Sequence, residues 1–334
     1  MDHNHGPALV FAVAGAGKTT AMVHRIERLV REGHANPNQI LATSFGKANI
    51  DDLTLALARW PHCAQVDCRT LHSLGYLLIK KAQRLGYLSH LNLRSNDNDS
   101  TSQQLLNQTL AAARQQSLSY ARELDGLDRQ DFLDYVGACK GNLAYPDLTA
   151  VTLPAPFAEV AQQAAAPSAK LSWYLDLYHL FETVRQKAGV VTFDDMLLTG
   201  WEALVRFPEL RTAVQSHYTY VLVDEFQDIN RAQAQILDLI TASKQNLMAI
   251  GDDDQCIYEW RGASPAYILK FPEQYAATVY KIENNFRCPA APLTLANQVI
   301  AYNRQRAPKR MGLTKGFAGE TAVFFSQDLA EMSQ

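Results

Sequence analysis

Residues 8–20 constrain this chain most, because they run from an apolar segment through small residues into Lys18 and Thr19. The run at 9–13 is typical of a buried strand, and the small residues after it let the backbone wrap around a polyphosphate at a helix N-terminus. Lys18 can then reach the β and γ phosphates, and the Thr19 hydroxyl can ligate Mg²⁺. Ala12 stands where the usual G-x-x-x-x-G-K-[ST] pattern has glycine, and the alternative is a simple turn of small residues. The strand, loop and helix together favour nucleotide binding.

The composition is that of an ordinary globular protein with two domains, or with one large domain and an insertion. The chain has 334 residues, 47% of them hydrophobic and 19% charged, and its formal net charge is −3. Such a chain has no overall basic field, so any nucleic-acid site has to be a local groove.

The spacing of cysteines and histidines gives no sign of a metal centre. The five cysteines show no C-x-x-C spacing, which predicts reduced thiols and a cytoplasmic location. No apolar run approaches the roughly 18 residues that span a bilayer, so we expect no membrane partner. Residues 7–16 could pass for a signal-peptide core, but Asp2 is acidic and Gly-Lys-Thr-Thr follows at once, which argues against secretion.

Strand-like and helix-like segments alternate through most of the chain. Strands are expected at 9–13, 39–45, 63–68, 220–223, 247–251, 279–282 and 321–325. Amphipathic helical segments lie between most of them, and this alternation predicts an α/β fold with a parallel sheet flanked by helices.

Residues 92–190 interrupt the alternation. A polar loop at 95–103 leads into helical periodicity at 102–117, 128–139 and 170–188, with a loop and short helix at 154–167. Because the alternation resumes afterwards, we interpret 92–190 as an inserted all-helical subdomain.

Two acids, Asp224 and Glu225, end the apolar strand at 220–223. A site for Mg²⁺ and ATP needs a carboxylate near the metal and a base for the attacking water, and these two residues fit the two roles. The alternative, a solvated acidic turn, is common in α/β proteins. Together with the phosphate loop, the pair favours a hydrolytic site.

The strand at 247–251 also ends in polar groups, Asp252-Asp253-Asp254-Gln255, which suit sensing of a γ-phosphate. Tyr258, Trp260 and Arg261 follow, and such residues can stack on unpaired bases and contact a nucleic-acid backbone. Taken alone, this segment is more often an aromatic turn in a core.

Together these blocks resemble the N-terminal part of superfamily-one DNA helicases of the UvrD/Rep/PcrA kind. The matching blocks are AGAGKTT (14–20), ATSFGKA (42–48), RTLHSL (69–74), TFDDML (192–197), VLVDEFQDIN (221–230), AIGDDDQCIYEWRGA (249–263) and ENNFRCP (283–289). The resemblance implies a RecA-like ATP-binding domain over 1–91 and 191–305, with 92–190 inserted. Residues 306–334 would begin a second domain that is truncated.

The resemblance also implies a site for ATP and Mg²⁺. Thr19 and Asp224 would hold the metal, Lys18 would bind phosphate and Glu225 would act as the base. Gln255 would couple the γ-phosphate to the DNA-binding residues. The rest of the phosphate loop would be Ala14, Gly15, Ala16, Gly17 and Thr20.

By the same resemblance Arg287 would be an arginine finger supported by Arg261, and Phe286 would stack on adenine where the family usually has tyrosine. Four residues would contact or stack on single-stranded DNA: Phe45, His72, Tyr258 and Trp260. Taken alone, these residues also have plainer interpretations. Phe45 would be a core residue, His72 a histidine at a helix start, and Arg287 a partner in a surface ion pair.

The chain departs from the family pattern in three places. Only seven residues precede the first strand, so the glutamine segment that reads adenine has no match. Thr20 stands where many members have arginine. The family's later motifs, including a second arginine finger, have no match before residue 334.

The resemblance therefore implies one half of a 3′-to-5′ single-stranded-DNA translocase or helicase, an enzyme that hydrolyses ATP. Its partners would be single-stranded DNA or a 3′-tailed duplex, and a missing C-terminal domain or partner chain. We expect little or no unwinding from these residues alone, because closing the ATP cleft takes two domains. Two alternatives stay open, namely a nucleotide-gated DNA-binding or regulatory module and the motor part of a helicase–nuclease subunit.

Overall fold

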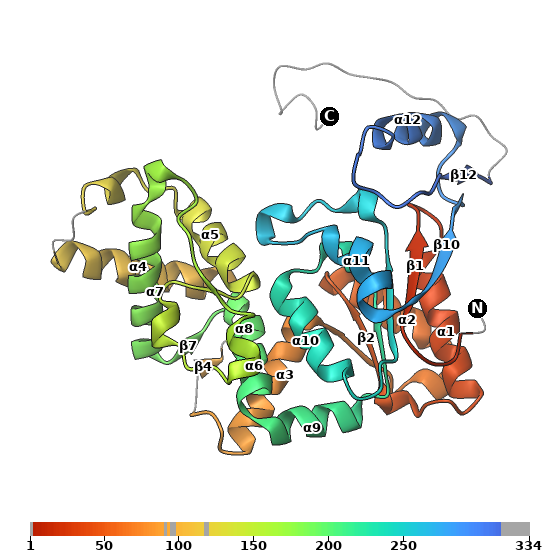
Figure 1. Cartoon of the computed structure of the whole chain (residues 1–334), viewed down its shortest axis with the longest axis horizontal. Helices are drawn as coiled ribbons and strands as arrows, with labels where there is room; N and C mark the ends of the chain where they lie inside the picture. Colours follow the sequence, from red (N-terminus) through yellow and green to blue (C-terminus); the bar gives the residue numbers. More distant parts are fainter. Residues whose placement is uncertain (1–2, 90–91, 94–97, 117–119, 315–334) are drawn as a thin grey trace.

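A six-stranded parallel sheet forms the centre of the part of the protein that lies at the right of Figure 1. The computed structural model describes residues 3–89, 92–93, 98–116 and 120–314. The strand order is β10-β1-β9-β8-β2-β3. The strands are β1 (Ala8–Ala12), β2 (Ile40–Ser44), β3 (Asp67–Thr70), β8 (Tyr220–Val223), β9 (Leu247–Gly251) and β10 (Thr278–Ile282). The expected α/β fold is confirmed.

Helices cover both faces of the sheet, because alternate side chains of its buried strands point to opposite sides. Leu9 and Phe11 of β1 pack in one core, and Val10 packs in the other. The helices α1 (Lys18–Arg31), α2 (Lys47–Leu57) and α12 (Ala290–Ile300) contribute to the second core. Five other helices contribute to the first core, the one that contains Leu9 and Phe11: α3 (Leu71–Arg84), α8 (Phe193–Arg206), α9 (Pro208–His217), α10 (Arg231–Thr241) and α11 (Ala266–Tyr275).

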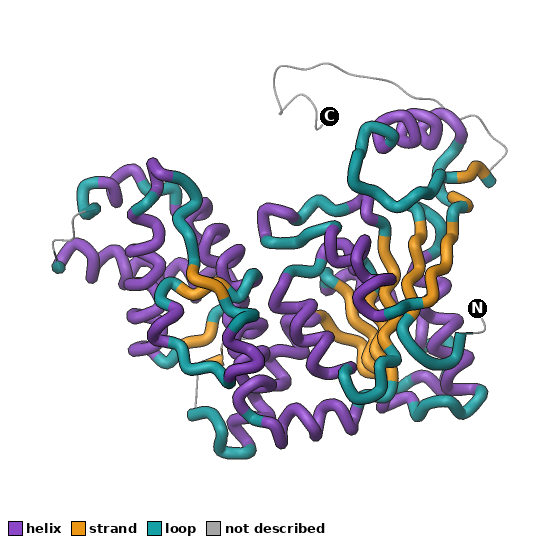
Figure 2. The backbone as a smooth tube through the Cα atoms, in the orientation of Figure 1, coloured by secondary structure: helices purple, strands orange, loops and turns teal. Residues whose placement is uncertain are grey.

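The region between α3 and α8 is mainly helical and has a hydrophobic core of its own, which includes Leu106, Phe132, Tyr178 and Phe181 (Figure 2). Its helices are α4 (Asn98–Gln115), α5 (Arg129–Gly141), α6 (Ala155–Ala158) and α7 (Trp173–Ala188). Two pairs of two-residue strands correct the expectation of an all-helical insertion: β4 (Asn92–Leu93) with β7 (Val190–Val191), and β5 (Ala144–Tyr145) with β6 (Gln162–Gln163).

A buried ion cluster joins this helical region to the sheet region. The Lys140 ammonium of α5 is 2.6 Å from the Asp195 carboxylate of α8 and 2.8 Å from the Glu182 carboxylate of α7. Lys140 and Asp195 are fully buried. Removing one partner of such a buried cluster leaves an uncompensated charge, so the cluster fixes α5 against α8.

The structure corrects one expected strand. Residues 61–63 form a 3₁₀ turn that starts at Pro61, and β3 begins only at Asp67. The reason is pairing: β2 offers backbone partners from Leu41 to Ser44, and these match residues 67–70. A short pair of strands, β11 (Asn284–Asn285) with β12 (Gly312–Leu313), was not expected from the sequence. The strand expected at 321–325 lies outside the described residues.

Within the described part of the chain, none of the helices has the length and apolar character needed to cross a bilayer.

Two glycines let α3 and α8 cross at very short distance. A Cβ added at Gly75 would overlap the carbonyl oxygen of Met196, and one added at Gly200 would lie 2.9 Å from the Gly75 Cα. The crossing sets the orientation of α3, whose first residues line the candidate site.

We expect Gly75→Ala to destabilise the protein by about 1–3 kcal/mol, because the added methyl group forces two packed backbones apart. In an unhindered helix the same change would stabilise by about 0.5–1 kcal/mol. The matched control is Gly126→Ala, since a Cβ at Gly126 meets nothing within 4 Å. Urea unfolding followed by circular dichroism gives both values, and equal midpoints for the two variants would contradict the close crossing.

Candidate nucleotide and DNA site

The phosphate loop connects β1 to the N-terminus of α1. Gly15 and Gly17 adopt left-handed backbone conformations with φ of 67° and 85°, which glycine tolerates without strain. Helix α1 starts at Lys18, so its first amide groups and its positive dipole end point out of the loop. The loop therefore has the form of an anion site, as the sequence predicted.

The segment with Arg287 lies directly on this loop. The side-chain amide of Asn285 donates to the Ala14 carbonyl at 2.7 Å, and the backbone N–H of Phe286 donates to the Gly15 carbonyl at 3.0 Å. A Cβ at Gly15 would come within 2.7 Å of the Arg287 Cβ, so glycine is required by contact as well as by φ. Two blocks about 270 positions apart in sequence meet here. The Phe286 ring is 55% exposed.

Asp224 and Glu225 follow β8 at the same edge of the sheet. The Lys18 ammonium is 2.9 Å from the Glu225 carboxylate, so the expected base and the lysine expected to bind phosphate form an ion pair. Burial raises the pKa of Asp224 to about 6, and the neighbouring Glu225 charge adds to the effect. A hydrogen bond with Thr19 acts in the opposite direction. Thr19 and Asp224, the two expected metal ligands, are therefore adjacent.

Gln227 is a site residue to which the sequence reasoning gave no role. Its side chain is 1% exposed, donates to the Glu225 carboxylate at 2.9 Å, and accepts from the Asp252 amide at 3.0 Å. It thereby connects the ends of β8 and β9. The available signal was its position two residues after the acid pair in VDEFQD. The pKa of neighbouring Asp228 is also raised to about 6, mainly by burial and then by Glu225.

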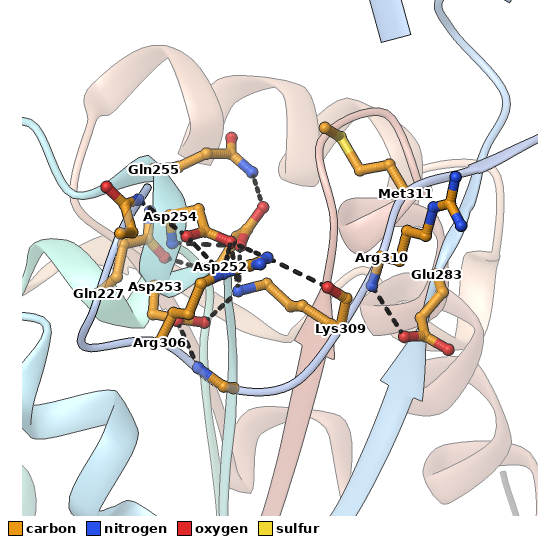
Figure 3. Close-up of polar contacts among 12 residues, drawn as sticks. Gln227, Asp252, Asp253, Asp254, Gln255, Glu283, Arg306, Lys309, Arg310 and Met311 are labelled. Atoms are coloured by element: carbon orange, nitrogen blue, oxygen red, sulfur yellow. Dashed lines mark hydrogen bonds and ion pairs between the residues drawn. The ribbon is translucent and has the colours of Figure 1, made fainter. Parts of the chain in front are cut away.

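Three consecutive acids after β9 are held by cations from residues 306–309, the segment expected to open a second domain (Figure 3). The Lys309 side chain is 1% exposed, and its ammonium lies 3.0 Å from Asp252 and 2.8 Å from Asp254. Arg306 donates to Asp254 at 2.8 Å. Gln255, the expected γ-phosphate sensor, donates to Asp252 at 2.5 Å. Nothing local in the sequence indicated Lys309.

Four expected DNA contacts come from three separate segments and lie near one another. Phe45 and Tyr258 stack with ring centroids 4.6 Å apart, and His72 stacks on Phe193 at 3.9 Å. Trp260 is 51% exposed beside them. Phe193 was missed as a site residue, although the block TFDDML contained it. We call these five residues the aromatic strip.

Arg261 lies with the aromatic strip and not with the phosphate loop. Its guanidinium is 4.5 Å from the Trp260 ring centroid, and it lines a hollow of about 120 Å³ together with Phe45, His72 and Phe193. Burial lowers the pKa of His72 to about 3, and the Arg261 charge contributes. The structure therefore places Arg261 beside the expected DNA contacts, and the support for the arginine finger that the resemblance implied stays a prediction.

The parallel sheet, the phosphate loop and the paired acids define a P-loop nucleotide-binding domain of the RecA-like class. A family model described as the UvrD/REP helicase N-terminal domain matches residues 1–276, so the chain belongs to this family. The resemblance found in the sequence blocks is confirmed.

Named relatives are DNA helicases. The chain is 28% identical over 320 residues to a probable DNA helicase II homolog of Rickettsia felis, which covers 92% of this chain and 44% of that protein. It is 29% identical over 310 residues to the ATP-dependent DNA helicase PcrA of Bacillus subtilis, covering 92% of this chain and 39% of PcrA. The chain thus spans less than half the length of these relatives.

We expect His72 to stay neutral from pH 8 down to about pH 4. Between the unfolded pKa near 6.5 and the folded value near 3, the unfolded state binds more protons, so stability falls as pH falls, by at most about 1.4 kcal/mol per pH unit. His72→Gln should make the free energy of unfolding less dependent on pH between about pH 3 and pH 6.5. Urea unfolding at several pH values measures the slope, and an imidazole NMR titration near pH 6.5 would contradict the expectation.

We expect Lys309→Met to destabilise the protein by about 3–5 kcal/mol, because three carboxylates lose their shared buried cation. Arg310→Met is the control, since it removes a charge from the neighbouring exposed residue. Thermal unfolding measures both variants, and equal losses would show that the buried cluster has no special role.

Proposed function

We propose that this chain is the ATP-binding and ATP-hydrolysing half of a DNA helicase that translocates 3′ to 5′ along single-stranded DNA. The observation that carries the proposal is the Lys18–Glu225 contact of 2.9 Å, which joins the phosphate loop to the acids after β8. The names of the relatives and the aromatic strip support DNA as the track.

The residues present fit ATP with Mg²⁺. The left-handed Gly15 and Gly17 shape the loop directly before α1, so that the free amide groups at the start of this helix can face a phosphate. Burial and the neighbouring Glu225 charge disfavour the charged form of Asp224, and a divalent ion beside Thr19 and Asp224 would stabilise that form. ATP supplies the phosphoanhydride bond that is hydrolysed.

Each residue then has a proposed role in hydrolysis. Lys18 exchanges its pairing with Glu225 for a phosphate oxygen, which releases the Glu225 carboxylate to accept a proton from the attacking water. Gln227 orients that carboxylate through the hydrogen bond at 2.9 Å. Arg287, held on the loop by Asn285, contributes positive charge toward the γ-phosphate.

The wider organisation is also a proposal. We infer that residues 92–190 form a subdomain inserted into one RecA-like domain, and that a second such domain, in the same or another chain, completes the ATP cleft. Partners would then be single-stranded DNA or a 3′-tailed duplex. The five free thiols support a cytoplasmic location.

In the gene product that contains this chain, Glu225→Gln should lower DNA-stimulated ATP hydrolysis by about 100-fold or more, while a fluorescent ATP analogue still binds. Glu159→Gln, an exposed glutamate in the helical region, is the matched control. A phosphate-release assay with and without single-stranded DNA measures the rates. A protein that binds both nucleotide and strand but never hydrolyses ATP would instead be a nucleotide-gated binding module.

A further inference from the structure

Helix α3 has two different faces. The close crossing with α8 at Gly75 buries the face with Leu71, Leu74, Leu78 and Ile79. The opposite face carries Ser73, Tyr76, Leu77, Lys80, Lys81 and Arg84, which recur at helical spacing and line a groove of about 920 Å³. The aromatic strip begins at the same helix, because His72 is its second residue.

This groove is continuous with the aromatic strip. A second hollow, of about 550 Å³, shares Arg69, Ser73 and Tyr76 with the α3 groove. The same hollow shares Phe45, His72 and Phe193 with the cavity beside Arg261. One path therefore leads from Arg261 across the aromatic strip and along α3. Figure 1 shows α3 at the border between the sheet region and the helical region.

The α3 groove concentrates positive charge in an acidic chain. Four of its described lining residues are cationic and none is acidic, whereas the whole chain has a net charge of −3. Arg69 is engaged by Asp67 at 2.5 Å, which leaves Lys80, Lys81 and Arg84 as the principal cations. Lys80 lies 5.6 Å from the Tyr76 ring centroid, so the groove also has an aromatic surface. The middle hollow is mixed, with Lys47 and Asp51.

We propose that the α3 groove binds the sugar–phosphate backbone of the same single strand beyond the aromatic strip. The inference rests on the proposed function. Ser73 to Arg84 spans about 16 Å at 1.5 Å per residue, which matches about five nucleotides. Cations that line a groove without acids suit phosphates, and the shared walls make the strand the natural occupant. Two other occupants, an acidic protein segment and a duplex, are tested with poly-glutamate and with blunt duplex DNA.

The test compares two triple variants of equal charge change. Lys80→Gln/Lys81→Gln/Arg84→Gln removes the groove cations. Lys187→Gln/Lys244→Gln/Lys270→Gln removes three exposed cations that line none of the three hollows. Fluorescence anisotropy with oligo-dT of about 8 to about 24 nucleotides measures affinity and its salt dependence.

We expect the groove variant to bind the longest oligonucleotide about tenfold more weakly than the control variant and the shortest one equally well. Its affinity should stop increasing at a length about five nucleotides shorter. Its slope of log affinity against log salt should fall by about two, since each neutralised phosphate of a single strand contributes about 0.7.

The results distinguish a failure of the α3 groove proposal from a failure of the proposed function. Equal affinities of the two triple variants at every length would overturn the groove while leaving the proposed function intact. Equal losses at all lengths, or a loss seen only with blunt duplex or with poly-glutamate, would also overturn it. If the wild-type chain binds no oligonucleotide of any length, the proposed function itself fails.

Discussion

The contact between Lys18 and Glu225 is the interaction on which the rest of the site depends. The two residues follow β1 and β8, which lie on either side of β9 in the sheet. Parallel strands bring their carboxyl ends to one edge, so an ion pair across β9 fixes the loops after all three strands. Gln227 fills the space between them with hydrogen bonds to the β8 and β9 loops. The phosphate loop, the acids after β8 and Gln255 after β9 are therefore joined by one chain of ion pairs and hydrogen bonds.

The helical region is attached to the sheet region by buried contacts. Lys140 and Asp195 tie α5 to α8, and α8 in turn is locked on α3 at Gly75. The aromatic strip takes residues from the start of α3, the start of α8 and the loops after β2 and β9. The His72–Phe193 stack thus joins the first turns of the two helices that cross at Gly75, so this part of the aromatic strip and the helical region share one support.

Sequence reasoning could predict the elements whose signals are local. The strand and helix periodicities around the phosphate loop, and the acids at 224 and 225, lie within a few residues of one another. The Lys309 cluster could not be predicted, because a lysine 55 positions after Asp254 has no local mark of burial. The contact of Arg261 with the Trp260 ring is a matter of tertiary packing that the sequence alone does not specify. The strand expected at 63–68 failed because β2 selects its partner by register and not by apolar content.

The left-handed backbone at Glu225 bears on how this domain can change over generations. A side chain at φ 53° carries a local cost of about 1–3 kcal/mol, which the surrounding contacts sustain. Glycine at this position would remove that cost, but it would also remove the contacts of the carboxylate with Lys18 and Gln227. The relief of backbone strain and the loss of these two contacts come together, so any substitution by glycine at residue 225 exchanges one for the other.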